Sequence, residues 1–386
     1  MNKIMNIISS ETHGKSFKTF KYCFDGIEVP TLSYDDHKDI TWEDYGETEV
    51  ITQAKNLKIF ADLLKNEQPL FKFFLDGSRR AFKVDDISYN QQVFPVIAGQ
   101  IGVGCCSRNN KFLKTEDFIK KNIIVLPDIA NQDDWNKEVF WGNLCKKIND
   151  NIPNKKISIS NIKSYKYIKN ETENLENKGI AVIQDFMIEN EILMVNKLVK
   201  TNKINYDNYL LKDGSLEYRV DNIKDPRKLR FFANTFNYVV GASKSFNPEN
   251  CRDKRGKNNS NMIADLPLYS RTPVNLYTST RLKGMRYAVW YVRIRDKKYT
   301  TNAFDGILKL EKILVLNDSN EHQILDTEEV DLITANIINE RNPVCYGSDF
   351  RWANHLYPIY ITEKFIKSKY LSNNMFTHCA SSFFIV

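Results

Sequence analysis

Residues 72–80 read KFFLDGSRR, an apolar run that carries Asp76 directly into a glycine. The same arrangement returns at residues 209–216, YLLKDGSL, where Asp213 ends the apolar run. Each stretch predicts a buried strand whose carboxyl end holds an aspartate at a tight turn. If the two strands are neighbours, the carboxylates begin a site for Mg²⁺ or Mn²⁺, because hard cations prefer oxygen ligands. Asp-Gly is also a common hairpin turn, so either copy taken alone fits an ordinary turn.

Length and composition describe an ordinary folded protein with a modest excess of basic residues. The 386 residues allow one elaborated domain or two, and 42% hydrophobic with 27% charged residues suffice for a sizeable core. The formal charge of +7 agrees with an anionic partner. No apolar run reaches the length of about 18 residues that predicts a membrane helix, and the first ten residues are too weakly apolar for a secretion signal. We therefore expect a cytoplasmic protein with no membrane partner.

Cysteine and histidine usage makes a zinc hydrolase a poor fit. Seven cysteines are scattered without a Cys-x-x-Cys pair, and the five histidines form no His-x-x-x-His signature. Reduced, mostly buried thiols are the expected state.

The chain divides into an N-terminal arm and one larger domain. Residues 1–65 mix short apolar clusters with acidic stretches and are expected to form a cap or docking arm. Residues 66–386 alternate strand and helix patterns, which is typical of an α/β fold. Within them, residues 149–178 are rich in Asn, Lys and Glu and are expected to form a polar insertion.

Glutamates on two expected helices add carboxylates to the pair of aspartates. The apolar stripe over residues 180–200 predicts a helix that carries Glu189 and Glu191 and leads into the strand ending at Asp213. A glutamate there can point across the strand end toward the same cation. Glu363 lies in the first two turns of a helix expected near the end of the chain. Solvated helix faces and the helix dipole also explain these glutamates.

Several cationic side chains are placed to contact nucleic acid. Lys244 closes an expected strand, and residues 251–261 form a basic polar loop suited to phosphates. The strand expected over residues 285–296 presents tyrosines and arginines on one face, which can stack on bases and bind the backbone, although an ordinary solvated face fits as well. The residues expected to bind nucleic acid are Lys244, Arg252, Lys254, Arg255, Arg271, Arg293 and Arg295.

The order of these features resembles the NurA family, prokaryotic nucleases with an RNase H-like core that act with a HerA-type hexameric ATPase. The resemblance spans residues 70–370 and rests on the ordered pair of Asp-Gly-Ser motifs, the helical glutamate before the second motif, the strand leading to Lys244, and the Tyr357-Pro358 helix start. It implies an α/β fold, an RNase H-like mixed sheet flanked by helices, with an N-terminal cap and inserted loops.

The resemblance also implies a set of metal ligands. Asp76, one helical glutamate and Asp213 match the ligand positions, with Glu191 preferred for its place nearer the helix centre and Glu189 as the alternate. The family has a histidine about two turns into the helix after Tyr-Pro, and Glu363 stands there in this chain. A carboxylate keeps a metal-ligating group at that position. His355 is the second candidate for it.

With those ligands, the resemblance implies a metal-dependent DNase, exonuclease or endonuclease, with two Mn²⁺ or Mg²⁺ ions in its site. It implies action on DNA ends with a HerA-like hexameric ATPase, in DNA repair or anti-phage defence, and a homodimer. An alternative from another class is a catalytically inactive subunit of the same fold that binds nucleic acid and docks the ATPase. An Argonaute PIWI-like module ranks last, because the sequence has no signature of a guide-end pocket.

Overall fold

A computed structural model of the chain describes residues 3–17, 22–23, 40–43, 53–131, 136–152, 157–168, 174–218, 226–247, 251–253, 256–279, 285–300, 303–315, 325–341 and 350–382. Its strands are β1 (Lys15–Phe17), β2 (Tyr22–Cys23), β3 (Ile40–Glu43), β4 (Lys55–Asn56), β5 (Phe71–Tyr89), β6 (Gln92–Asn109), β7 (Phe112–Pro127), β8 (Asn161–Tyr165), β9 (Tyr209–Asp213), β10 (Val239–Ser243), β11 (Ser270–Arg271), β12 (Asn275–Ser279), β13 (Arg286–Arg293) and β14 (Ile307–Ile313). Its α-helices are α1 (Lys3–Thr12), α2 (Lys58–Leu64), α3 (Lys137–Asn151), α4 (Leu175–Lys200), α5 (Pro226–Thr235), α6 (Ser260–Ala264), α7 (Thr327–Glu340), α8 (Tyr357–Ser368) and α9 (Asn373–Ser382).

In this described part, 14 strands pair into one mixed sheet, whose main path runs β3-β12-β13-β14-β10-β9-β5-β6-β7-β8. Strands β5, β6 and β7 form an antiparallel meander. Strand β9 pairs in parallel with β5, and β10 pairs in parallel with β9. The central order β7-β6-β5-β9-β10 is that of an RNase H-like core. The predicted α/β class, a mixed sheet flanked by helices, is confirmed.

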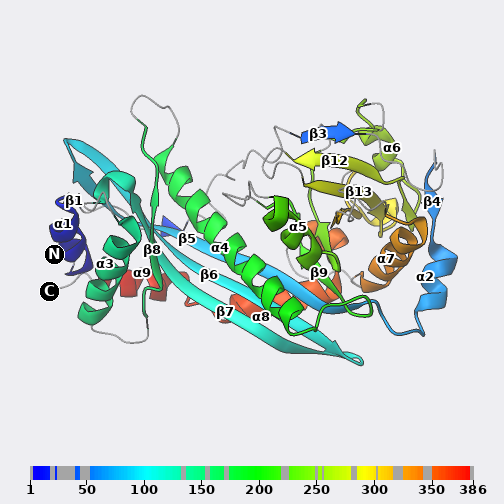
Figure 1. The fold of residues 1–386 in the computed structure, drawn as a ribbon, viewed down its shortest axis with the longest axis horizontal. Helices are drawn as coiled ribbons and strands as arrows, with labels where there is room; N and C mark the ends of the chain where they lie inside the picture. Colours follow the sequence, from blue (N-terminus) through cyan, green and yellow to red (C-terminus); the bar gives the residue numbers. More distant parts are fainter. Residues whose placement is uncertain are drawn as a thin grey trace.

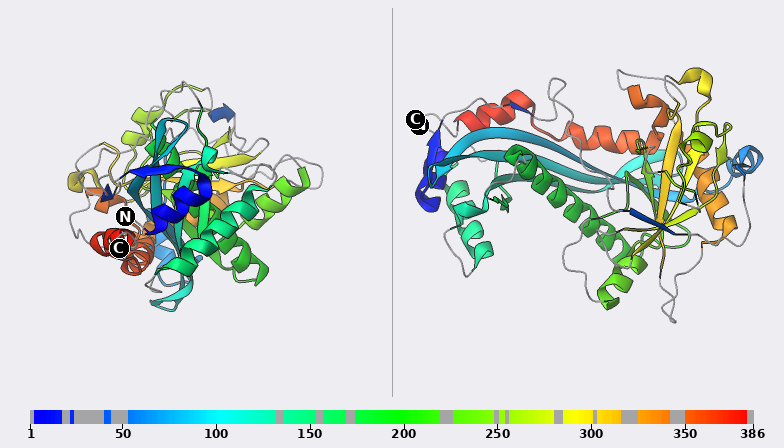
Figure 2. Two further views of the ribbon diagram at one scale, coloured as in Figure 1. Left: turned by 90° about the vertical axis from the view of Figure 1, so that its left-hand side faces the viewer. Right: turned by 90° about the horizontal axis from the view of Figure 1, so that it is seen from above.

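Strands β5 to β7 form a long antiparallel extension of the sheet, here called the blade, that reaches toward α1 and α3 (Figure 1). Helix α4 lies along one face of the blade, and α8 and α9 lie along the other (Figure 2). With both faces covered, β6 is buried along most of its length, as its apolar sequence predicts. Helix α8 approaches β6 closely at Gly104, where a Cβ would lie 2.7 Å from the Ile366 side chain.

Strand β5 continues without a break through Asp76 and Gly77, so the turn expected there is wrong. Asp76 pairs with Gly104, and Gly77 pairs with Val103, in a ladder that β6 extends on both sides of the motif. Asp213 does end its strand, and Gly214 follows it with φ of 84°, a conformation that glycine adopts readily. The two Asp-Gly pairs differ because β5 has a partner strand beyond its aspartate, whereas the ladder between β9 and β10 ends at Asp213.

Strand alternation sorts the side chains of β5 and β9 onto two faces of the sheet. Leu75 packs in the hydrophobic core on the α4 side. Phe74 and Leu211 pack in the core on the side of α7 and α8. Asp76 and Asp213 lie two residues further along the same faces as Phe74 and Leu211, so both carboxylates point toward the α8 side.

The first 65 residues contribute strands to the same sheet, since β1 and β2 pair with β5, β3 with β12 and β4 with β11. Helix α2 packs against α7, where the Asn339 side chain donates to the carbonyl of Ala61 at 2.7 Å. Residues 149–178, expected to form a polar insertion, hold the end of α3, strand β8 and the start of α4 at Leu175. None of the helices that the structure describes is long and apolar enough to cross a membrane.

Candidate metal centre

Three carboxylates converge on the α8 face of the sheet. Asp76 lies within β5, Asp213 ends β9 and Glu363 lies on α8, and one oxygen from each lies within 4.8 Å of the others. The register explains the meeting of the aspartates: Leu75 pairs with Lys212 in the parallel β5–β9 ladder, so the next residue on each strand is also adjacent. The two aspartate strands are therefore neighbours, which was the condition for a shared site.

A buried lysine lies within this group. Lys244, directly after β10, places Nζ 2.7 Å from Oδ2 of Asp213 and 3.6 Å from Oε2 of Glu363, and its side chain is only 9% exposed. Burial lowers the pKa of Lys244, but Asp213, Asp76 and Glu363 outweigh burial and raise it to about 12. Lys244 was expected to bind nucleic acid. The structure places its ammonium among the carboxylates.

The three carboxylates differ in how well their charge is compensated. Burial, and after it the charge of Asp213, raise the pKa of Asp76 well above its usual value, against the opposing effect of Lys244. Oδ2 of Asp76 is buried and accepts no hydrogen bond from any residue that the structure describes. Burial would also raise the pKa of Glu363, but Lys244 and Lys367 outweigh it and lower that pKa. Asp76 is therefore the carboxylate whose negative charge is least compensated, and a bound cation would compensate it.

Glu191 lies on the other face of the sheet and outside the three-carboxylate group. Its Oε2 lies 3.1 Å from Nζ of Lys212. Its Oε1 lies close to Gly77, since a Cβ placed on that glycine would be only 2.1 Å from this oxygen. Gly77 faces α4 because its neighbour Asp76 faces α8, so the backbone of β5 separates Glu191 from the cluster. Among the described residues, Glu191 does not belong to the carboxylate group that contains Asp76.

The two alternate ligands expected from the sequence are Glu189 and His355. Glu189 lies two residues before Glu191 on α4 and so on a different side of the helix. Its side chain is 55% exposed and lies 3.5 Å from Nζ of Lys163. His355 is buried, stacks on Tyr360, and is among the groups that lower the pKa of Glu363, after Lys244 and Lys367. Neither Glu189 nor His355 belongs to the three-carboxylate group of the described chain.

The turn after Asp213 is held by two charged residues, Lys212 and Glu311, that the sequence analysis missed. On the α4 side, Nζ of Lys212 donates to the carbonyls of Asp213 and Ser215 at 2.8 and 3.2 Å. From β14, Oε2 of Glu311 accepts hydrogen bonds from Oγ of Ser215 at 2.6 Å and the backbone N–H of Leu216 at 2.8 Å. The available signal was the run Lys-Leu-Glu-Lys at 309–312, where charges interrupt an apolar strand.

Two of the arginines expected to bind nucleic acid are buried, so that expectation is wrong for them. Arg271 donates to Oδ1 of Asp331 at 2.7 Å, and Arg293 donates to backbone carbonyls, including that of Leu266 at 2.8 Å. Arg293 ends β13, which pairs with both β12 and β14, and Arg271 lies on β11, which pairs with β13 and β4. Arg295 lies with its guanidinium 5.0 Å from the Trp352 ring.

The rest of the expected basic surface is only partly described. Arg252 is half-buried in a short bridge with Asn258. Lys254 and Arg255 lie outside the described residues.

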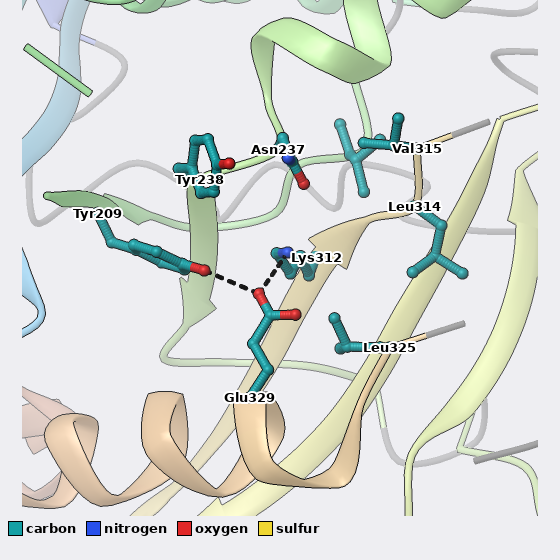
Figure 3. Close-up of a pocket in the computed structure, with 9 residues that line it drawn as sticks. Tyr209, Asn237, Tyr238, Lys312, Leu314, Val315, Leu325 and Glu329 are labelled. Carbon is teal, nitrogen blue, oxygen red and sulfur yellow. Dashed lines mark hydrogen bonds and ion pairs between the residues drawn. The ribbon is translucent and has the colours of Figure 1, made fainter. Parts of the chain in front are cut away.

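A polar pocket of about 140 Å³ lies at the opposite end of β9 (Figure 3). Oε1 of Glu329 accepts hydrogen bonds from the Tyr209 hydroxyl at 2.9 Å and from Nζ of Lys312 at 2.6 Å. Burial lowers the pKa of Lys312, and the charge of Glu329 opposes this shift. Lys312 is thus another buried lysine of the sheet that pairs with a carboxylate, but no converging group of acids surrounds it in the described part of the chain.

Replacing Gly77 with alanine tests the contact between α4 and β5. The new Cβ would collide with the buried Glu191 carboxylate, so we expect the free energy of unfolding to fall by about 1–3 kcal/mol, the usual cost of overpacking. Gly142→Ala is the matched control, because no atom lies within 4 Å of a Cβ at that position of α3. Urea denaturation of both variants measures the difference. Equal stability of the two variants would contradict the placement of Glu191.

Comparison with known proteins finds a distant structural similarity. No family model matches the sequence, and no curated protein matches it. Among solved structures, the chain is similar to the crystal structure of the NurA nuclease from Sulfolobus solfataricus, with 11% sequence identity and a TM-score of 0.41 over 78% of this chain and 80% of that chain. What this protein does is therefore inferred from its own residues.

Proposed function

We propose that the protein is a divalent-metal-dependent DNA nuclease. Its active site, formed by Asp76, Asp213 and Glu363, would hydrolyse phosphodiester bonds. The observation that carries the proposal is the convergence of these three carboxylates on one face of an RNase H-like sheet, with a buried oxygen of Asp76 left without a hydrogen bond from the described residues. Carboxylate oxygens are the ligands that Mg²⁺ and Mn²⁺ prefer, so the donor set fits the cation.

Each residue of the proposed site has a separate role. Asp76 and Asp213 would hold the cation on two strands whose pairing fixes their separation, and Glu363 would close the site from α8. A bound divalent cation supplies Lewis acidity and neutralises negative charge on the phosphodiester. The Lys244 ammonium, held within the same group, stabilises negative charge that develops on the phosphoryl oxygens. Lys212 and Glu311 fix the turn that carries Asp213.

The proposal extends to partners and biological role. The substrate is DNA, most simply a DNA end, as the basic net charge of +7 also favours. By resemblance to the NurA family, the protein acts as a homodimer with a HerA-like hexameric ATPase, in DNA repair or anti-phage defence. Light scattering of the purified chain, and co-purification with a hexameric ATPase encoded beside it, test these two assemblies.

A second candidate function is a catalytically inactive subunit that binds nucleic acid and docks the ATPase. The position of Lys244 favours it, because an ammonium that pairs with Asp213 and Glu363 competes with a metal ion for those oxygens. Cleavage assays separate the two candidates directly.

The deciding experiment is hydrolysis of linear DNA by the purified protein with Mg²⁺ or Mn²⁺, and with EDTA. We expect cleavage that needs the cation, and Asp213→Asn should lower its rate by at least about 10²-fold, the scale of losing one preorganised contact to the transition state. Asp62→Asn is the control, since Asp62 is an exposed residue of α2 paired with Lys65. No cleavage by the wild type, alone or with the ATPase, would favour the inactive subunit.

A further inference from the structure

The position of Lys244 bears on how many metal ions the site can hold. We propose that the Lys244 ammonium takes the place of one of the two cations expected from the sequence, so that the site binds a single divalent ion next to Asp76. This inference rests on the proposed nuclease function and specifies the cofactor content of that site.

The geometry places the ammonium where a second cation would bind. A cation shared by Asp213 and Glu363 would need the space that Nζ of Lys244 fills, 2.7 Å from one carboxylate and 3.6 Å from the other. The lysine has little freedom to leave, because its side chain is 9% exposed. In addition, the backbone carbonyl of the same residue accepts a hydrogen bond from the Asn354 side chain at 2.6 Å.

Glu363 is already compensated on both oxygens. Lys244 approaches Oε2, and Lys367, one turn further along α8, lies 2.5 Å from Oε1. A carboxylate between two ammonium groups is a poor ligand for a further cation, so Glu363 acts mainly to hold Lys244. Asp76, whose buried Oδ2 accepts no hydrogen bond from the described residues, is the group that still lacks a counter-charge.

Charge balance leads to the same number. Asp76, Asp213 and Glu363 carry three negative charges when ionised, and Lys244 and Lys367 carry two positive ones, which leaves −1. One divalent ion brings the group to +1. Two divalent ions would bring it to +3 in a site that is largely removed from water, where like charges repel strongly.

The count of bound ions tests this directly. Titration of the full chain with Mn²⁺, followed by the electron paramagnetic resonance signal of free Mn²⁺, should give one tightly bound ion per chain. Lys244→Ala should bind a second ion, and its first ion should bind at least about tenfold more tightly, because a neighbouring positive charge is gone. Lys312→Met is the matched control, since it removes another buried, carboxylate-paired lysine of the sheet and should leave one ion.

The outcomes are distinguishable. Two tightly bound ions in the wild type, or no gain of a second ion in folded Lys244→Ala, would overturn the single-ion proposal while the nuclease function stands. If Lys244→Ala does not fold, Lys244→Arg keeps the charge and must still bind one ion, and the wild-type count itself decides. If no ion binds and no DNA is cleaved, the proposed function fails.

Discussion

Asp76→Asn should abolish metal-dependent DNA cleavage and at the same time stabilise the metal-free protein. Asparagine keeps the shape of the side chain but cannot supply the negative charge that a hard cation requires. The same change removes a buried carboxylate whose charge Lys244 offsets only in part. We expect a loss of cleavage of at least about 10²-fold together with a melting temperature higher by a few degrees in EDTA.

The pH dependence of this gain has a definite sign. Burial and Asp213 raise the pKa of Asp76 in the folded chain, so the folded state binds this proton more tightly than the unfolded state does. Stability from this group is present at acid pH and is lost as the pH rises through the raised pKa. The advantage of Asp76→Asn should therefore be largest at pH 8 and shrink toward pH 4, as thermal denaturation in EDTA will measure.

Asp213→Asn is the contrasting variant. Asp213 is the partner of Lys244 at 2.7 Å, so its replacement leaves that buried ammonium less well compensated and should lower the melting temperature. Both variants should lose cleavage, but only Asp76→Asn should gain stability. A loss of stability in Asp76→Asn would mean that its carboxylate is already compensated in the metal-free protein.

Glu311→Ala should give the largest loss of stability among the changes near the site. Glu311 is fully buried, and its Oε1 lies 2.5 Å from Nζ of Lys309, itself only 6% exposed. Removing one member of a buried ion pair leaves the other charge without compensation, which costs about 3–5 kcal/mol. The Ser215 hydroxyl and the Leu216 N–H also lose their acceptor, so the turn that carries Asp213 should loosen and cleavage should fall.

Acid should remove the same stabilisation in the wild type. Burial would raise the pKa of Glu311, but Lys309 and the hydrogen bonds from Ser215 and Leu216 outweigh it and lower the pKa to about 2. A depressed pKa contributes stability above the unfolded value of 4.5, on the order of 3 kcal/mol, which is lost as the pH falls from there toward 2. In urea denaturation, the wild type and Glu311→Ala should differ less in stability at pH 3 than at pH 7.

Glu329→Ala provides the comparison for Glu311→Ala. It also removes the partner of a buried lysine, Lys312, but the Glu329 side chain is 27% exposed, so water can replace part of the pairing. We expect a smaller loss of stability and no loss of cleavage. A loss in Glu329→Ala equal to that in Glu311→Ala would show that burial does not set the cost of these pairs.

Local sequence pattern was sufficient for the fold class and for the two aspartates. The apolar runs ending in Asp76 and Asp213 predicted strands. The side chain of an aspartate in a strand can lie only on one face of the sheet or the other. That the two strands are neighbours was a condition of the prediction, and the parallel pairing of β5 with β9 meets it. The helix carrying Glu189 and Glu191 was also expected, although it begins at Leu175, five residues before the apolar stripe.

Long-range pairing and packing settled everything about which side chains share a face. Asp-Gly reads the same locally whether a strand ends there or continues, and only the ladder with β6 carries β5 past Asp76. Because neighbouring strand residues face opposite ways, that register sends Asp76 toward Glu363 and leaves Glu191 on the far side of Gly77. The same dependence buries Arg271 and Arg293, which looked like surface cations, and places Lys244 among the acids. The residues next to a side chain in the sequence do not indicate which strands and helices will pack around it, so the composition of the site followed from the fold.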